Sequence, residues 1–299
     1  MAFGDIQFTA GHFARGTPRQ FQFRDSLRHA MSSFPIDFAV TIGDFGEERV
    51  NENGQDYTET NAIANEYDGD WYSCVGNHDV NVSGDYDPAE VTEWYDQTPF
   101  EVNTQIRTLG YGRLSRPGNV EIIVLNSQEN YSGGGSPATG IQAIGQTQLD
   151  WFSAELDMIT NANARIIVLV HAPLKSATLR PPGNPADNLH DQTQAALIVD
   201  LLIDWQSASD GGLVLGVIAG HTHVDDFSES TTANGTINHF TIDEFDEVPA
   251  GYPGSADVVS TDTRWMSYAH FSFNEANKIL TVTGVGEQAS IVVDMSGRV

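Results

Sequence analysis

The chain has 299 residues, 40% of them hydrophobic and 10% aromatic, which is enough for a large core in one α/β domain or two ordinary ones. Its net charge of −27 makes double-stranded nucleic acid and anionic membrane surfaces unfavourable partners, because both would be repelled. With this hydrophobic content, the acidity does not indicate disorder.

The first half of the chain alternates helical and strand patterns. Residues 19–34 have apolar positions at a helical period, and residues 36–44 form an apolar run that ends in Gly-Asp. Further apolar runs at 71–79 and 121–127 also end in polar residues. These runs predict strands whose last residues are polar.

The alternation continues toward the C-terminus. Residues 145–160 carry an apolar stripe at helical spacing, and residues 165–173 predict a strand with a polar end. Residues 195–206 predict a helix, and residues 213–223 a strand that ends in two histidines. Strands that are apolar along their whole length and alternate with helices indicate a sheet covered on both faces.

The last part of the chain has a different pattern. Three segments predict successive β-strands, at 237–245, 264–275 and 278–285. Neither an internal repeat nor a linker stands out, so we expect residues 1–299 to form a single domain. Segments 80–118, 127–144 and 174–194 are long, polar and rich in Gly or Pro, which predicts loops.

Polar side chains stand at or just after the ends of five expected strands, and most are residue types that bind metal ions. In strand order they are Asp5, Asp44, Asn77 with His78, His171, and His221 with His223. Because ligands collect beyond the carboxyl ends of strands in open α/β sheets, these side chains would converge on one region. Each residue alone has an ordinary structural explanation, but five such strand ends together favour a metal site.

Five short motifs carry a resemblance to a known family. They are GDIQ (4–7), GDF (43–45), GNHD (76–79), VHAP (170–173) and GHTH (220–223). In this order they resemble the motifs of the calcineurin-like metallophosphoesterases, and the resemblance covers about residues 1–225. It implies a four-layer α/β/β/α sandwich with two mixed β-sheets, in which the β-rich part 226–299 completes the second sheet.

The resemblance also implies a centre of two divalent metal ions. Asp44 would bridge the two ions, which need a shared anion to offset their repulsion. The other ligands implied are Asn77, His171 and His221 at one ion, and Asp5 and His223 at the other, where Gln7 stands at the position of a further ligand.

Two residues of the third motif would act on the substrate. By resemblance, His78 is not a ligand but stabilises charge on the phosphoryl group or protonates the leaving oxygen, with Asp79 as its orienting partner. Candidate substrate contacts are Arg180 and His190, in the expected loop 174–194, although a salt-bridged arginine and a surface histidine are the more ordinary interpretations.

One position departs from the family pattern. The first motif usually has the form Asp-x-His, whereas this chain has Asp5-Ile6-Gln7. An amide oxygen is a poorer ligand for borderline metals and shifts preference toward oxygen-loving ions. We therefore expect manganese, with iron, zinc and magnesium as alternatives, and leave open whether Gln7 binds a metal, holds a metal-bound water or does neither.

The function expected from the resemblance is hydrolysis of a small phosphomonoester or phosphodiester by attack of metal-bound hydroxide. The alternative is a phosphoesterase fold kept as a binding or structural module with reduced or no activity, such as a component of a virus particle, a homo-oligomer or another assembly. A third hypothesis is a nuclease that acts on single-stranded nucleic acid, which is disfavoured because the negative chain would repel the phosphates.

The cellular location is predicted from cysteine content, apolar runs and the N-terminal pattern. Cys74 is the one cysteine, so no internal disulfide can form. Neither a run of 18 apolar residues nor an N-terminal signal pattern is seen. We expect a cytoplasmic protein, with a place in a virus particle as the alternative.

The scarcity of lysine among the basic residues suggests that the stability of the protein depends on salt concentration. Only two of the 14 basic residues are lysines, Lys175 and Lys278. An acidic, lysine-poor surface suits a halophilic protein, because concentrated salt screens its self-repulsion. The competing interpretation is an ordinary acidic protein.

A halophilic chain loses stability when salt is removed, since repulsion among its 41 acidic residues is then no longer screened. We expect the thermal unfolding midpoint, followed by circular dichroism, to fall steadily as sodium chloride is dialysed away. A midpoint that stays the same in dilute buffer identifies the ordinary acidic protein.

Overall fold

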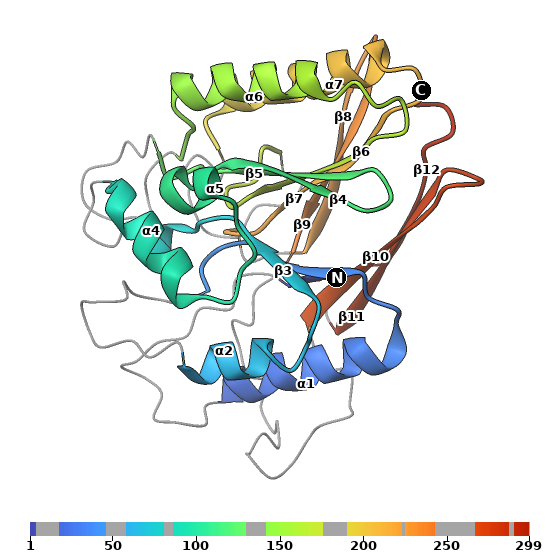
Figure 1. The fold of residues 1–299 in the computed structure, drawn as a ribbon. Coiled ribbons are helices and arrows are strands. Elements are labelled where there is room, and N and C mark those ends of the chain that lie inside the picture. The colour runs from blue at the N-terminus through green and yellow to red at the C-terminus, as the bar shows by residue number, and fades with distance from the viewer. Residues whose placement is uncertain are drawn as a thin grey trace.

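The computed structural model describes residues 1–3, 18–45, 58–80, 86–129, 142–175, 190–222, 225–242, 267–286 and 290–298. Two six-stranded sheets lie face to face, and helices cover the outer face of each (Figure 1). This arrangement is the α/β sandwich with two mixed sheets that the sequence predicts.

The first sheet, sheet I, contains both the N-terminal strands and the last strands of the chain. Its strand order is β12-β11-β10-β1-β2-β3. Strands β1, β2 and β3 are parallel, whereas β10, β11 and β12 are antiparallel to their neighbours. The strands are β1 (Ala2–Phe3), β2 (Phe38–Thr41), β3 (Asp70–Ser73), β10 (Ser267–Asn274), β11 (Ile279–Gly286) and β12 (Ile291–Asp294).

The second sheet, sheet II, has the order β4-β5-β6-β7-β9-β8. Strands β5, β6, β7 and β9 are parallel, and the two edge strands are antiparallel to their neighbours. The strands are β4 (Gly112–Arg116), β5 (Val120–Leu125), β6 (Arg165–Val170), β7 (Leu213–Ala219), β8 (Asp226–Thr232) and β9 (Gly235–Thr241).

The outer layers consist of helices on opposite sides of the sandwich. Helices α1 and α2 lie below sheet I in Figure 1, and α6 and α7 lie above sheet II. The helices described are α1 (Pro18–Ser33), α2 (Thr58–Ala64), α3 (Asn77–Val80), α4 (Pro88–Gln97), α5 (Thr104–Leu109), α6 (Gln146–Met158) and α7 (Gln192–Ala208).

Strand β5 shows why the central strands are apolar along their whole length. Ile122 and Val124 belong to the core cluster between the sheets, whereas Ile123 and Leu125 belong to the cluster under α6 and α7. Successive side chains of a strand point to opposite faces, so both faces are buried. The second face is covered by the other sheet rather than by helices, which the strand pattern alone does not distinguish.

One segment expected to be a loop contains regular structure. Within 80–118 the structure places α4, α5 and β4. Asp87 caps α4 by accepting the Ala89 N–H, and Asn103 caps α5 by accepting the Ile106 N–H. These helices are short, so their apolar positions repeat too few times to stand out from the polar residues around them.

The strands after residue 225 divide between the two sheets. Strands β8 and β9 extend sheet II beyond β7, whereas β10, β11 and β12 continue sheet I from β1. The resemblance implied that residues 226–299 complete the second sheet, and it gave no indication of this division between the sheets. Strand β8 was also missed, because the edge sequence DFSESTT has no apolar run.

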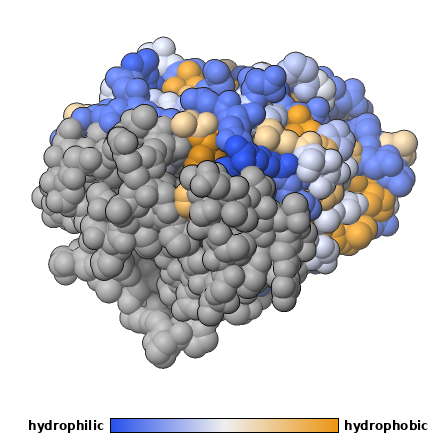
Figure 2. Space-filling model, turned by 90° about the horizontal axis from the view of Figure 1, so that it is seen from below, coloured by the Kyte–Doolittle hydropathy of each residue, from blue (hydrophilic) through white to orange (hydrophobic). Residues whose placement is uncertain are grey.

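Figure 2 shows hydrophilic residues over most of the described part of one face, with apolar residues in small separate patches. Among the helices that the structure describes, none has both the length and the apolar character needed to cross a membrane.

His239 in β9 gives a test of the fold that is separate from the site. Its side chain is buried, with Nε2 3.0 Å from Ser230 Oγ and Nδ1 without a partner among the described residues. Burial, with a smaller contribution from the positive charge of Lys175, lowers the pKa of His239 to about 4. The unfolded chain therefore binds a proton near pH 6.5 that the folded chain does not bind until about pH 4.

Stability from His239 is thus fully present above pH 6.5 and is lost as the pH falls toward 4. The loss reaches about 3 kcal/mol in the free energy of unfolding. We expect His239→Gln, which cannot titrate, to lose less stability than the wild type between pH 7 and pH 4.5 in urea denaturation. Parallel pH dependence in the two proteins contradicts the prediction.

Candidate metal centre

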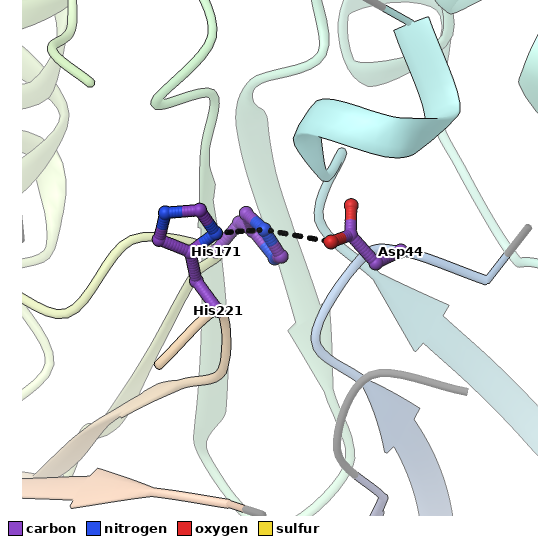
Figure 3. Close-up of side chains that lie close together, drawn as sticks. All are labelled: Asp44, His171 and His221. Atoms are coloured by element: carbon purple, nitrogen blue, oxygen red, sulfur yellow. Dashed lines mark hydrogen bonds and ion pairs between the residues drawn. The ribbon is translucent and has the colours of Figure 1, made fainter. Parts of the chain in front are cut away.

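Four of the predicted ligands come from two pairs of neighbouring parallel strands. Asp44 follows β2 and Asn77 follows β3, which pair in sheet I. His171 follows β6 and His221 follows β7, which pair in sheet II. The carboxyl ends of both pairs meet where the two sheets adjoin, and Figure 3 shows three of these side chains directed toward one another.

The four side chains are in direct contact around one atom, His171 Nε2. This nitrogen lies 2.8 Å from Asn77 Oδ1 and 3.1 Å from His221 Nδ1. It lies 3.3 Å from Asp44 Oδ2. Ligand atoms of Asp44, His171 and His221 all lie within 4.8 Å of one another, and all three residues are buried.

The hydrogen bond of the other ring nitrogen, Nδ1, determines which nitrogen of His171 carries the proton. Nδ1 lies 2.7 Å from the carbonyl oxygen of Ile42, which can only accept, so Nδ1 carries the proton. In the neutral imidazole Nε2 then presents a lone pair toward the oxygens of Asn77 and Asp44. Lone pairs that face one another in a buried site are satisfied by a cation, and this set of nitrogen and oxygen donors suits a divalent metal ion.

Asp44 is ionised in this setting. Burial is the largest single effect and opposes ionisation, but attraction to the protonated forms of His171, His78 and His221 together outweighs it and lowers the pKa of the Asp44 carboxyl. A metal ion bound beside the neutral imidazoles would exert the same attraction on the carboxylate. The backbone N–H of His78 also donates to Asp44 Oδ1 at 2.8 Å. A buried carboxylate held in its charged form is the state that binds a metal ion.

Two glycines allow the loops after β2 and β3 to touch. A Cβ on Gly76 would overlap the backbone nitrogen and Oδ1 of Asp44. Gly43 has φ +82, and a Cβ there would lie 2.6 Å from the nitrogen of Gly76. Asp44 and His221 themselves have positive φ, 46 and 66, which costs energy in residues other than glycine and is held by the surrounding structure.

The sequence matches the model of the calcineurin-like phosphoesterase family over residues 1–225. The chain belongs to this family. A search of curated proteins gave no match.

Solved structures of phosphatases share the fold of this calcineurin-like phosphoesterase. A dimetal phosphatase from Danio rerio has a TM-score of 0.65 at 14% identity, over 99% of this chain and 98% of that one. A purple acid phosphatase from yellow lupin seeds has a TM-score of 0.59 at 14% identity, over 98% of this chain and 52% of that one. PhoD has a TM-score of 0.56 at 12% identity, over 98% of this chain and 67% of that one.

Asp79 links the two loops of the first sheet. Its Oδ1 accepts the Phe45 N–H at 3.0 Å, and its Oδ2 accepts the Gly76 N–H at 2.9 Å. The carboxylate therefore fixes the loop after β2 to the loop after β3. Its predicted role in orienting His78, which is half-buried beside it, stays a prediction.

Several predicted site residues lie outside the described residues. They are Asp5, Gln7, Arg180 and His223. Their predicted roles as ligands of the second ion and as a substrate contact stay predictions.

His190 is not on the surface, so the surface position that we favoured from the sequence is wrong. The side chain is 1% exposed, and its backbone N–H donates to the carbonyl of Pro173 in the loop that carries His171. Burial lowers the pKa of His190 to about 4, so the ring is neutral near pH 7. The loop sequence gave no sign of burial because it lacks an apolar run.

Gln142 is a site residue that the sequence does not reveal. Its side chain is fully buried, and its Nε2 lies 2.9 Å from His221 Nε2 and 3.4 Å from Asn77 Oδ1. It stands in the expected loop 127–144 and belongs to no motif, so the sequence does not predict a place for it at the metal centre.

Gly76→Ala tests the close approach of the two loops. Because the added methyl group overlaps Asp44, we expect the free energy of unfolding to fall by about 2–3 kcal/mol and Mn²⁺ binding to weaken. Chemical denaturation and calorimetric titration with Mn²⁺ measure the two effects. The matched control is Gly297→Ala, where a Cβ meets nothing within 4 Å. If both variants behave alike, the loops do not depend on this contact.

Proposed function

We propose that this protein hydrolyses phosphate esters with two divalent metal ions bound at this centre. The family assignment supports a metal-dependent phosphoesterase in general. The observation that carries the proposal is the convergence of lone-pair atoms from two sheets around His171 Nε2. A buried cluster of this kind is costly without a cation and is the donor set that a metallohydrolase requires.

The residues fit the predicted ligand roles. We assign Asp44 as the bridging ligand, because its buried carboxylate is ionised and can offset the repulsion between two cations. Asn77, His171 and His221 are the remaining ligands of the first ion. We assign Asp5, Gln7 and His223 to the second ion on the family pattern. The amide oxygens of Asn77 and Gln7 favour Mn²⁺ over softer ions.

When bound, the metal ions would supply Lewis-acid polarisation of the phosphoryl group and an activated water molecule. The chain holds the ligands rigid: His171 is fixed by Ile42, and Asp44 by the N–H of His78. We assign the half-buried His78 to protonation of the leaving oxygen on the family pattern. Small mono- and diesters of phosphate are the substrates that we propose.

The test measures nitrophenolate release from p-nitrophenyl phosphate and bis(p-nitrophenyl) phosphate in the presence of Mn²⁺. We expect turnover by the wild type, and at least a 100-fold lower kcat/KM for Asp44→Asn, because the neutral amide cannot hold two cations together. Asp294→Asn is the control, since this carboxylate lies on the exposed side of β12.

The same experiment separates the proposal from the alternative of a binding or structural module. A wild type that binds Mn²⁺ but hydrolyses neither ester, with Mn²⁺, Fe²⁺, Zn²⁺ or Mg²⁺, contradicts hydrolysis and favours the module. Equal activity of Asp44→Asn and the wild type would remove Asp44 from the reaction.

A further inference from the structure

A polar cluster beside the predicted ligands holds the side chain of Gln142 in one orientation. Its Oε1 accepts the hydroxyl of Ser127 at 3.1 Å and also accepts from Gln128 Nε2. Because Gln128 Nε2 can only donate, turning the amide over would place two donors against each other and lose this hydrogen bond. The N–H groups of Gln142 therefore face the metal centre.

These N–H groups lie against ligand atoms of the centre. Gln142 Nε2 is 2.9 Å from His221 Nε2 and 3.4 Å from His221 Nδ1, so it reaches either nitrogen of the ring. It is 3.4 Å from Asn77 Oδ1. A neutral imidazole has one lone pair, and a metal ion at His221 uses it. Whichever ring nitrogen binds the metal, Gln142 then loses His221 as an acceptor.

A buried N–H that loses its acceptor is unfavourable until another acceptor arrives. The oxygens of a phosphoryl group are anionic acceptors and would stand next to the metal ions. We propose that Gln142 donates an N–H to a non-bridging oxygen of the phosphoryl group of the substrate, and equally to inorganic phosphate. This inference rests on the proposed function, because it requires metal ions and a phosphate ester at the centre.

Three buried residues that adjoin Gln142 or a predicted ligand also carry polar atoms without a partner among the described residues. Gln128 Oε1, His190 Nε2 and Thr222 Oγ1 are all buried and have no hydrogen-bond partner among the described residues. Gln128 bonds to Gln142, the backbone of His190 pairs with that of Gln142, and Thr222 follows His221 in the chain. Such atoms are rare in a native interior unless water or a ligand satisfies them.

The experiment compares phosphate binding by the Mn²⁺-loaded wild type and variants at Gln142. Gln142→Met keeps the length of the side chain and removes the N–H groups, and Gln142→Asn keeps the amide but withdraws it from the site. The matched control is Gln148→Met, because Gln148 is equally buried but binds the backbone of Asn126 instead. Calorimetry gives the Kd of Mn²⁺ first, then the Kd of inorganic phosphate, and thermal unfolding establishes that each variant is folded.

We expect the Kd of phosphate to rise roughly 10- to 100-fold in both Gln142 variants, as for loss of one hydrogen bond to a charged group. The Kd of Mn²⁺ stays within about threefold of the wild type, because Gln142 is not a ligand. Gln148→Met loses thermal stability but binds phosphate as the wild type does.

Unchanged phosphate binding in a folded, Mn²⁺-loaded Gln142→Met overturns the inference, while hydrolysis by the wild type leaves the proposed function standing. Loss of Mn²⁺ binding in both Gln142 variants also overturns it, since the residue would then act on the ligands and not on the substrate. Conversely, weaker phosphate binding in the variants with no turnover by the wild type supports the contact and rejects the proposed function. A wild type that binds neither Mn²⁺ nor phosphate overturns both.

Discussion

The two hydrogen-bonding directions of the His171 ring connect the two halves of this structure. His171 belongs to the end of β6 in sheet II, and its Nδ1–H donates to the carbonyl of Ile42, beside β2 in sheet I. The opposite nitrogen faces Asn77 and Asp44, which also belong to sheet I. One imidazole thus fixes the junction of the sheets and forms the centre of the ligand cluster. The position of the two sheets at this edge and the geometry of the site are therefore coupled, because both involve this ring.

The same constraint explains why the local backbone is unfavourable. Asp44 and His221 both have positive φ, and Gly43 and Gly76 leave no room for a side-chain atom. Positive φ costs about 1–3 kcal/mol at a residue other than glycine. Four lone-pair side chains facing one another add to that cost in the absence of a cation. Metal binding and folding stability are therefore expected to be linked, since an ion that binds only the folded chain stabilises it.

Charge poses a particular problem for a phosphoesterase with a net charge of −27. The acidic chain attracts divalent cations but repels phosphate anions, and bound metal ions reverse the local sign of the field. Within such a site a neutral donor adds affinity for an anionic oxygen without competing with the metal ions. The amide of Gln142, held by Ser127 and Gln128, is a donor of this kind. Shape and neutral hydrogen bonds thus complement the charge of the metal ions.

The sequence by itself determined the order of the motifs, the fold class and the residues that meet at the centre. Asp44, Asn77, His171 and His221 could be predicted because each stands just after a strand of a parallel pair, where neighbouring carboxyl ends meet. Only the tertiary structure decided that the strands after residue 225 divide between the sheets, and that Gln142 and His190 are buried beside the ligands. Strand partners and the course of a loop depend on contacts between residues far apart in the chain. No local period of hydrophobic residues records such contacts, so they follow from packing alone.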